Sequence, residues 1–258
     1  MLLVTEKLCK AFGGLRAVNN IEFQMDNGEI VAIIGPNGSG KTTFFNMITG
    51  IMPVTAGRII FNGHDVTGLK AHDMTIRGMA RTFQNIRLFD NLTARDNIII
   101  GRYCRTTSGL LDGLLYSQRL RQEEQLNESK VHELLAFVGL SHCRNMMAKN
   151  LPYGAQRRLE IARALASDPQ LLLLDEPAAG MNPQEVDELL ALLEELKKRG
   201  LTILLIEHQM RLVMGIANRV VVFDHGEKIA DGLPQEVRYN AKVVEAYLGH
   251  EVAKNAYY

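Results

Sequence analysis

Short apolar runs separated by turn residues dominate both ends of this chain. The run 171–174 is four consecutive leucines, and the run 202–206 reads Thr-Ile-Leu-Leu-Ile, which is typical of strands buried on both faces. Turn pairs such as Asn62-Gly63 separate the other runs and predict further strands. These further strands are expected at residues 2–8, 21–25, 30–34, 58–61, 80–83, 219–223 and 228–231.

The remaining pattern is helical. Residues 183–199 carry apolar side chains at the i, i+3, i+4, i+7 spacing of a helix that Gly200 ends. Asn182 as N-cap, Pro183 at the first turn and Glu185 three residues after the cap predict a capping-box start. Residues 85–166 are polar and helical without a strong strand. We therefore expect one α/β domain, residues 1–258, with a core of 1–84 and 167–258 and a helical subdomain of about 85–166.

Composition narrows the class of protein. Hydrophobic residues make up 47% of the 258 residues, enough for a substantial core. Lys+Arg and Asp+Glu both total 29, which gives no support to a nucleic-acid binder held by a basic face. Three cysteines lie far apart, which indicates reduced thiols rather than a disulfide framework. No signal peptide is expected, because residues 1–7 lack its charged and apolar regions. No membrane span is expected either, because no apolar run approaches the required length, so any membrane role needs a partner.

A glycine-rich segment follows the apolar run 30–34 and matches G-x-x-x-x-G-K-T, the P-loop pattern, in its expected strand–turn–helix setting. Its glycines allow backbone N–H groups to face a polyphosphate at a helix N-terminus. Lys41 is expected to meet the β- and γ-phosphates, and the Thr42 hydroxyl to ligate Mg²⁺. The sequence therefore predicts a nucleoside triphosphate site. Its residues are Gly35, Pro36, Asn37, Gly38, Ser39, Gly40, Lys41, Thr42 and Thr43.

Polar residues directly follow the other buried strands, where open parallel sheets bind their ligands. Asp175 and Glu176 follow the four leucines, and a carboxylate pair there needs a cation or donors. We expect Asp175 to hold Mg²⁺ and Glu176 to polarise the water that attacks the γ-phosphate. His208 follows the run 202–206 and is expected to sense that phosphate. Gln84 ends the run 80–83, where an amide can touch Mg²⁺ or the water and hinge the helical segment. Spacing alone leaves this role open.

The order and spacing of these residues resemble an ATP-binding cassette (ABC) ATPase over nearly the whole chain. The resemblance implies ATP as the nucleotide and Glu176, His208, Lys41 and Gln84 as the catalytic set. Phe12 matches the aromatic that stacks on adenine, although the residue type alone fits a core position equally well. The fold implied is a P-loop core with an antiparallel β subdomain and an inserted α-helical subdomain.

Residues 151–155 occupy the family's signature position, usually L-S-G-G-Q, which clamps ATP held by the opposite subunit. This chain retains Leu151 and Gly154 but carries Pro152, Tyr153 and Ala155. Pro152 lacks the hydroxyl and the N–H of the usual serine, so we hypothesise an asymmetric dimer in which this signature binds weakly. The alternative is that Pro152 only starts a helix. Asn182 replaces a usual aspartate and is expected to serve as cap and interface residue.

Residues 12–18, 80–89, 176–183 and 206–210 resemble the ATPase subunits of branched-chain amino acid importers. The resemblance implies a second ATPase subunit, two transmembrane permease subunits, indirect dependence on an extracytoplasmic solute-binding protein, no nucleic acid, and a place at the cytoplasmic face of the membrane. Two alternatives stay open: an importer ATPase for urea or amides, and a soluble ABC ATPase acting on nucleic acid or ribosomes. A metabolite kinase fits less well, because Gln84, Glu176 and His208 suit attack by water.

Overall fold

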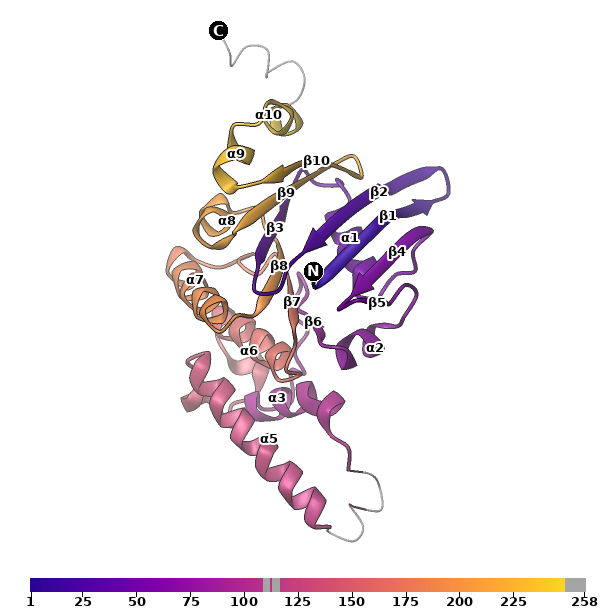
Figure 1. Cartoon of the computed structure of the whole chain (residues 1–258). Coiled ribbons are helices and arrows are strands. Elements are labelled where there is room, and N and C mark those ends of the chain that lie inside the picture. Colours follow the sequence, from indigo (N-terminus) through magenta and orange to yellow (C-terminus); the bar gives the residue numbers. More distant parts are fainter. Residues whose placement is uncertain (109–111, 113–116, 249–258) are drawn as a thin grey trace. The chain divides into compact units, whose positions relative to one another are not determined.

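The computed structural model describes residues 1–108, 112 and 117–248. Its contacts divide the chain into two compact units, one of residues 1–74 and 173–258 and the other of residues 75–172. Helix α2 (Ala71–Ile76) and strand β7 (Leu171–Asp175) cross the boundaries between them (Figure 1). The sequence places the boundaries at 84/85 and 166/167. Each unit is described by itself below.

The first unit contains an antiparallel sheet in the order β2-β1-β4-β5. Its strands are β1 (Leu3–Phe12), β2 (Leu15–Met25), β4 (Ala56–Phe61) and β5 (His64–Asp65). Alternation explains why β2 is a strand with one covered face, because Ile21, Phe23 and Met25 are buried while Glu22 and Gln24 are exposed. The expected antiparallel subdomain is confirmed, with β1 and β2 longer than the sequence predicts.

The same unit contains the strands β10-β9-β3-β8-β7 in that order. They are β3 (Ile30–Ile34), β8 (Thr202–Ile206), β9 (Arg219–Asp224), β10 (Glu227–Gly232) and β7. Strand β3 pairs in parallel with β8 and β9, and β10 pairs antiparallel with β9. Every residue of β3, β7 and β8 is buried, as expected for a parallel sheet covered on both faces.

Strand register brings the polar residues after these strands to one edge. Ile33 pairs with Ile206 and Ile34 with Val222, so β3, β8 and β9 end together. The P-loop follows β3 and His208 follows β8 at that edge. The fold therefore places two of the predicted functional segments side by side.

Helices cover this core. They are α1 (Lys41–Ile48), α7 (Pro183–Lys198), α8 (Met210–Ile216), α9 (Pro234–Arg238) and α10 (Ala241–Leu248). Phe44 of α1 is fully buried between Phe23 of β2 and Phe223 of β9, with ring centroids 5.6 and 5.3 Å away in edge-to-face geometry. These contacts fix the helix that begins at the P-loop against strands of both sheets.

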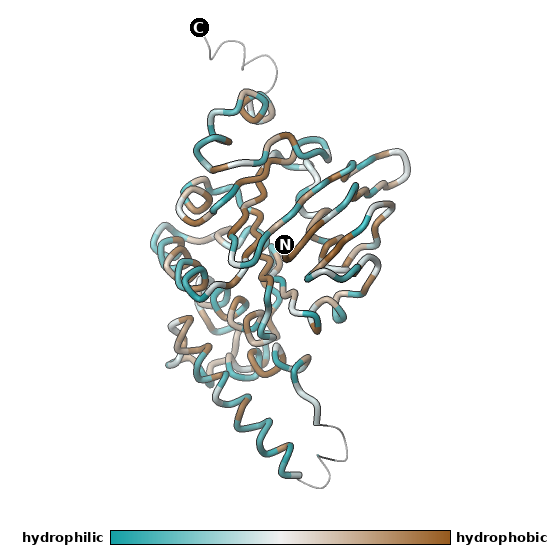
Figure 2. Tube along the Cα trace, in the orientation of Figure 1, coloured by the Kyte–Doolittle hydropathy of each residue, from teal (hydrophilic) through white to brown (hydrophobic). Residues whose placement is uncertain are grey.

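The second unit is mainly helical. It contains β6 (Met79–Arg81), α3 (Ala94–Arg102), η1 (Tyr103–Arg105), α5 (Gln118–Phe137), η2 (Ser141–Cys143), η3 (Ala148–Asn150) and α6 (Tyr153–Leu165). Figure 2 shows that α5 is largely hydrophilic along its length, and its buried residues are Val131, Leu134 and Leu135. The inserted α-helical subdomain expected from the sequence is confirmed.

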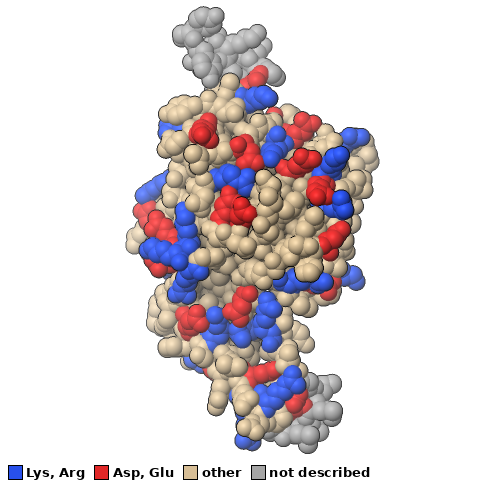
Figure 3. All heavy atoms as spheres, in the orientation of Figure 1, with Lys and Arg blue, Asp and Glu red and all other residues tan. Residues whose placement is uncertain are grey.

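Charged side chains of both signs alternate over the face shown in Figure 3, in line with the equal totals of 29 acidic and 29 basic residues. Among the described residues, no helix combines the length and apolar character that crossing a membrane requires.

The start of α7 gives a testable consequence. The Asn182 side chain accepts from the Glu185 N–H, and the Glu185 carboxylate accepts from the Asn182 N–H, each at 3.0 Å. Asn182→Ala removes one half of this capping box and should lower the free energy of unfolding by about 1 kcal/mol in urea denaturation. Asn182→Asp keeps an acceptor and should lose far less. Equal losses in the two variants would contradict the capping role.

Candidate functional site

The P-loop needs glycine at defined positions. Gly35 has φ of +148°, and a Cβ there would lie 2.0 Å from the carbonyl oxygen of Phe223. Gly40 has φ of +99°, and its Cβ would lie 2.3 Å from the carbonyl oxygen of Ala17. Both positions combine a left-handed backbone with backbone contact, so no other residue fits without moving the loop. The glycine spacing read from the sequence therefore has a steric cause.

Lys41 lies at the centre of this loop. Its ammonium donates to the carbonyl oxygens of Gly35 and Pro36 at 2.7 and 2.8 Å and to Ser39 Oγ at 3.3 Å. Burial lowers the pKa of Lys41, and the nearby carboxylates of Glu176 and Asp175 oppose that shift. Lys41 is therefore a positive charge shared by the loop and the two acidic residues at the end of β7, Asp175 and Glu176.

The first turn of α1 suits an anion. Gly40 is its N-cap and offers no side-chain oxygen to the N–H groups of that turn, which contains Thr42 and Thr43. The turn holds no acidic residue either. Helix N-termini carry partial positive charge and free N–H groups, so this end of α1 can bind phosphate oxygens.

Strand β7 carries its carboxylates to the same region. Asp175 is its last residue and is 2% exposed. Glu176 follows with φ of +47°, a left-handed conformation that costs about 1–3 kcal/mol in a residue other than glycine. The Glu176 N–H donates to Ile206 O of β8 at 2.9 Å, which holds this conformation beside the neighbouring strand.

His208 lies against the Glu176 carboxylate, with 3.0 Å between His208 Nε2 and Glu176 Oε1. The residue before it, Glu207, is buried and accepts three backbone N–H groups, a role that the sequence did not suggest. In the first unit, the structure thus brings Lys41, Asp175, Glu176 and His208 together at one sheet edge.

The oxygen atoms of this edge suit magnesium. Asp175 offers a carboxylate and Thr42 a hydroxyl, both hard donors of the kind that Mg²⁺ prefers. Among the described residues, no group of three or more His, Cys, Asp or Glu forms a metal cage. A site with so few protein ligands matches Mg²⁺ held largely by substrate phosphates and water.

Phe12 is the last residue of β1 and is 47% exposed. The Lys10 ammonium lies 5.2 Å from the centre of its ring. The core position that the residue type also allowed is thereby excluded. A ring exposed in this way can stack with a base. That Phe12 stacks on adenine therefore stays a prediction.

Gln84 belongs to the second unit and follows β6 in a stretch without regular secondary structure. The fully buried guanidinium of Arg157 in α6 holds that stretch, donating to the carbonyl oxygens of Phe83 and Gln84 at 2.7 Å each. Arg157 also donates to the Glu160 carboxylate at 3.0 Å, and Glu160 accepts from the Arg87 N–H at 3.2 Å. Burial raises the pKa of Glu160, and Arg157 opposes that shift. Sequence reasoning missed Arg157, because only the fold brings it to residues 83–87.

The predicted signature segment leads into α6. Leu151 is buried, Pro152 is the N-cap of the helix, and Tyr153 is 43% exposed. Gly154 and Ala155 are buried in the first turn. Pro152 thus begins the helix from the cap position, where its missing N–H costs no helical hydrogen bond. The clamping role of this segment stays a prediction.

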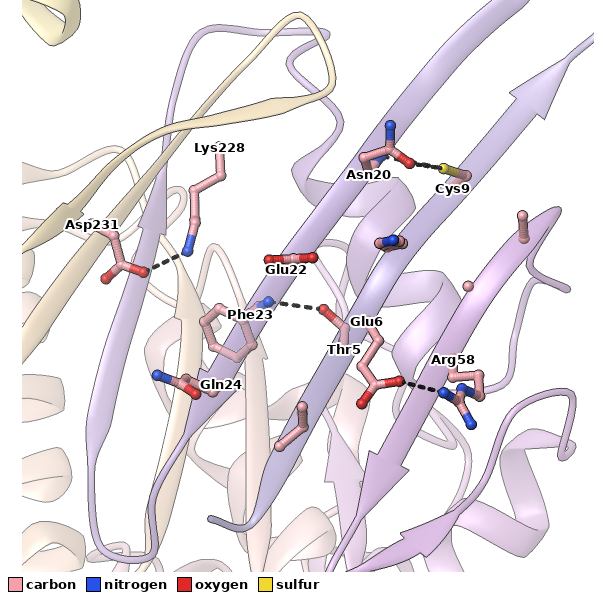
Figure 4. A pocket seen from close by; sticks show the side chains of 14 residues that line it. Thr5, Glu6, Cys9, Asn20, Glu22, Phe23, Gln24, Arg58, Lys228 and Asp231 are labelled. Carbon is pink, nitrogen blue, oxygen red and sulfur yellow. Dashed lines mark hydrogen bonds and ion pairs between the residues drawn. The ribbon is translucent and has the colours of Figure 1, made fainter.

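A pocket of about 880 Å³ lies on the strands of the first unit, and none of the predicted site residues lines it. Figure 4 shows two ion pairs among its lining side chains, Arg58 with Glu6 and Lys228 with Asp231, each at 2.9 Å. A smaller pocket of about 560 Å³, lined mostly by apolar side chains of α8, α9 and α10, reaches His208.

Comparisons with known proteins agree with this geometry. Residues 18–179 match the ABC transporter family, and residues 227–253 match the family described as branched-chain amino acid ATP-binding cassette transporter. The chain is 42% identical to BraF of Pseudomonas aeruginosa and 44% identical to LivG of Salmonella typhimurium, over 96% of this chain and 98% of each relative. Both relatives are described as high-affinity branched-chain amino acid transport ATP-binding proteins.

A solved structure is also similar to this chain. It is a nucleotide-free ATP-binding cassette from an ABC transporter, and it matches with a TM-score of 0.84 and 34% identity, over 96% of this chain and 99% of that one.

The buried pair in α6 generates a prediction. Arg157→Met leaves the Glu160 carboxylate buried without its cation and should lower the free energy of unfolding by about 3 kcal/mol or more in urea. Arg121→Met on the exposed face of α5 is the control and should stay within about 0.5 kcal/mol of the unmodified chain.

A second variant separates loss of the pair from loss of packing. Arg157→Met combined with Glu160→Met removes both charges. The double variant should therefore lose less free energy of unfolding than the two single variants lose together. A double variant as unstable as that sum would show that the ion pair is not what Arg157 contributes.

Proposed function

This chain belongs to the ABC transporter family of ATP-binding cassette ATPases, and we propose that it is the ATP-hydrolysing subunit of an importer for branched-chain amino acids. The observation that carries the chemical part of the proposal is the convergence of Lys41, Asp175, Glu176 and His208 on one sheet edge. The similarity to BraF and LivG supports branched-chain amino acids as the transported solutes.

ATP binding follows from the P-loop. The N–H groups of residues 35 and 37–43 and the Lys41 ammonium neutralise the phosphates, and Phe12 stacks on adenine. Thr42 and Asp175 would hold Mg²⁺, which would supply positive charge to the phosphates of the bound nucleotide. A contact of Gln84 with the metal or the attacking water is proposed from the sequence and the family resemblance.

Hydrolysis assigns different roles to the two side chains that touch. Glu176 orients the attacking water and accepts its proton, because its carboxylate stays partly accessible, at 19% exposure. His208 presents an imidazole to the γ-phosphate while its Nε2 stays within reach of Glu176. The contact between them places the Glu176 carboxylate, which orients the water, next to the His208 imidazole, which contacts the γ-phosphate.

Transport requires partners that this chain does not contain. We propose that a second ATPase subunit closes over the nucleotide, through residues 151–155 and Asn182 of this chain and their counterparts. Closure and release then drive two permease subunits, which receive the solute from an extracytoplasmic binding protein. The chain works at the cytoplasmic face of the membrane and handles no nucleic acid.

The altered signature supports an asymmetric pair of ATP sites. Pro152 offers neither a hydroxyl nor an N–H, and the loss of one hydrogen bond to a charged phosphate costs about 1.5–3 kcal/mol. The site completed by this segment is therefore the weaker one, and the site built on this chain's own P-loop is the stronger.

Glu176→Gln tests the catalytic assignment. The amide keeps the shape but cannot take a proton, so steady-state hydrolysis should fall about a hundredfold or more while ATP binding persists. Hydrolysis by the purified complex and equilibrium binding of ATP provide the two measurements. Glu194→Gln, on the exposed face of α7, is the matched control and should hydrolyse ATP normally. Turnover of Glu176→Gln at the control's rate would remove Glu176 from this role.

Uptake tests the cargo. A strain that lacks this chain should lose uptake of leucine, isoleucine and valine but not of urea. Unmodified protein should restore it, and Lys41→Ala should not, because its P-loop has lost the ammonium group. Loss of urea uptake alone would favour the importer for urea or amides. Unchanged uptake of every solute would favour a role outside transport.

A further inference from the structure

Glu207 is a carboxylate in an unusual place. It directly follows β8, it precedes His208, and it is 2% exposed. A carboxylate removed from water is costly unless donors meet it. In this structure all of its donors are backbone N–H groups, and they come from two different loops.

The two carboxylate oxygens divide the loops between them. Glu207 Oε1 accepts from the Ala178 N–H at 3.0 Å, in the loop that follows β7. Glu207 Oε2 accepts from the N–H groups of His208 and Gln209 at 2.6 and 3.0 Å, in the loop that follows β8. One side chain therefore joins the loop that begins with Glu176 to the loop that contains His208.

Gln209 makes the complementary bond. Its side-chain amide donates to the Ala178 carbonyl oxygen at 3.2 Å, so both backbone groups of Ala178 bond to side chains of the β8 loop. On the other side of Pro177, the Glu176 N–H donates to Ile206 O of β8. The backbone on both sides of Pro177 is thus tied to the strand and loop that lead to His208.

These bonds explain how Glu176 stays in place. Its left-handed φ of +47° persists only where surrounding contacts impose it. With the flanking backbone anchored to β8 and to Glu207, the Glu176 carboxylate is held 3.0 Å from His208 Nε2. A slip of either loop would open this distance.

Glu207 does not itself carry out chemistry. It is 2% exposed, and each of its oxygens accepts from at least one backbone N–H group. We propose that Glu207 is a positioning residue for hydrolysis, which holds Glu176 and His208 in contact by joining their loops. The proposal rests on the proposed function, in which Glu176 and His208 act on ATP.

Glu207→Gln tests it. An amide has one acceptor oxygen, so its NH₂ must face the N–H of Ala178 or those of His208 and Gln209, and the connection between the loops breaks. We expect kcat of the assembled complex to fall about tenfold or more, the effect of losing a hydrogen bond to a charged group. ATP affinity should stay within about twofold, because no P-loop contact changes.

Glu29→Gln is the matched control. Glu29 is a partly buried carboxylate that accepts from the Asp26 N–H at 3.1 Å and from Arg219 at 2.7 Å. It lies directly before β3, at the end opposite the P-loop. The same chemical change there should leave kcat unchanged, whatever it costs in thermal stability. A kcat loss in Glu29→Gln as large as that in Glu207→Gln would overturn the proposal.

A double variant asks whether Glu207 acts through His208. In a His208→Ala background the contact is already gone, so Glu207→Gln should reduce kcat by less than about twofold further. A full tenfold loss in that background would overturn the proposal. So would an unchanged kcat in the single variant, or a parallel loss of ATP affinity and kcat.

Amide hydrogen exchange of the nucleotide-free chain separates this proposal from the catalytic roles. Glu207→Gln should accelerate exchange at Ala178 or at His208 and Gln209, whichever loop loses its acceptor, and Glu29→Gln should not. Unchanged exchange at all three amides would overturn the proposal without reference to activity. If exchange changes as expected but Glu176→Gln still hydrolyses ATP normally, the connection stands and the catalytic assignment fails.

Discussion

The need to place charge at the edge of an apolar sheet governs the structure of the first unit. Strands β3, β7 and β8 are buried along their whole length. Strand β7 ends in Asp175, Glu207 directly follows β8, and the P-loop that contains Lys41 follows β3. Charges that leave water in this way are tolerated only when they meet opposite charges or hydrogen-bond donors. Lys41 meets carbonyl oxygens and two carboxylates, and Glu207 meets three N–H groups. The positions of Lys41 and Glu207 at this sheet edge therefore follow from the need to give each charge its partners.

Local patterns predicted most of the strands. The runs 30–34 and 202–206 became β3 and β8 with those bounds, because an uninterrupted apolar run between turn residues leaves little choice. The Asn182 capping box was also readable, since a cap is a short-range interaction. Strand β6 was placed less well: it ends at Arg81, whereas the apolar pattern continues to Phe83. Beyond Arg81 the backbone bonds Arg157 instead of a neighbouring strand.

The part of the site that escaped prediction has one physical feature in common. Arg157 and Glu207 act through bonds to the backbone of segments that lie far away in sequence, 74 positions for Phe83 and 29 for Ala178. Every residue has a backbone carbonyl group, and every residue except proline has an N–H group. The sequence therefore does not show which of these groups a distant side chain will bond. A charged residue next to an apolar run is the only sequence signal, and of these two residues only Glu207 had it, because it directly follows the run 202–206. Arg157 stands between Gln156 and Arg158, and only the fold places it on the buried face of α6.

Arg157 in the second unit and Glu207 in the first both fix the conformation of a loop. A loop that carries a functional side chain lacks regular backbone pairing, so its conformation must be imposed by something else. Arg157 supplies donors to the carbonyl groups of Phe83 and Gln84, and Glu207 supplies acceptors to N–H groups in the loops of Glu176 and His208. In each case one buried charge orders several backbone groups at once, which a neutral side chain with fewer hydrogen bonds cannot do. In this chain, buried charges therefore order the loops that follow β6, β7 and β8.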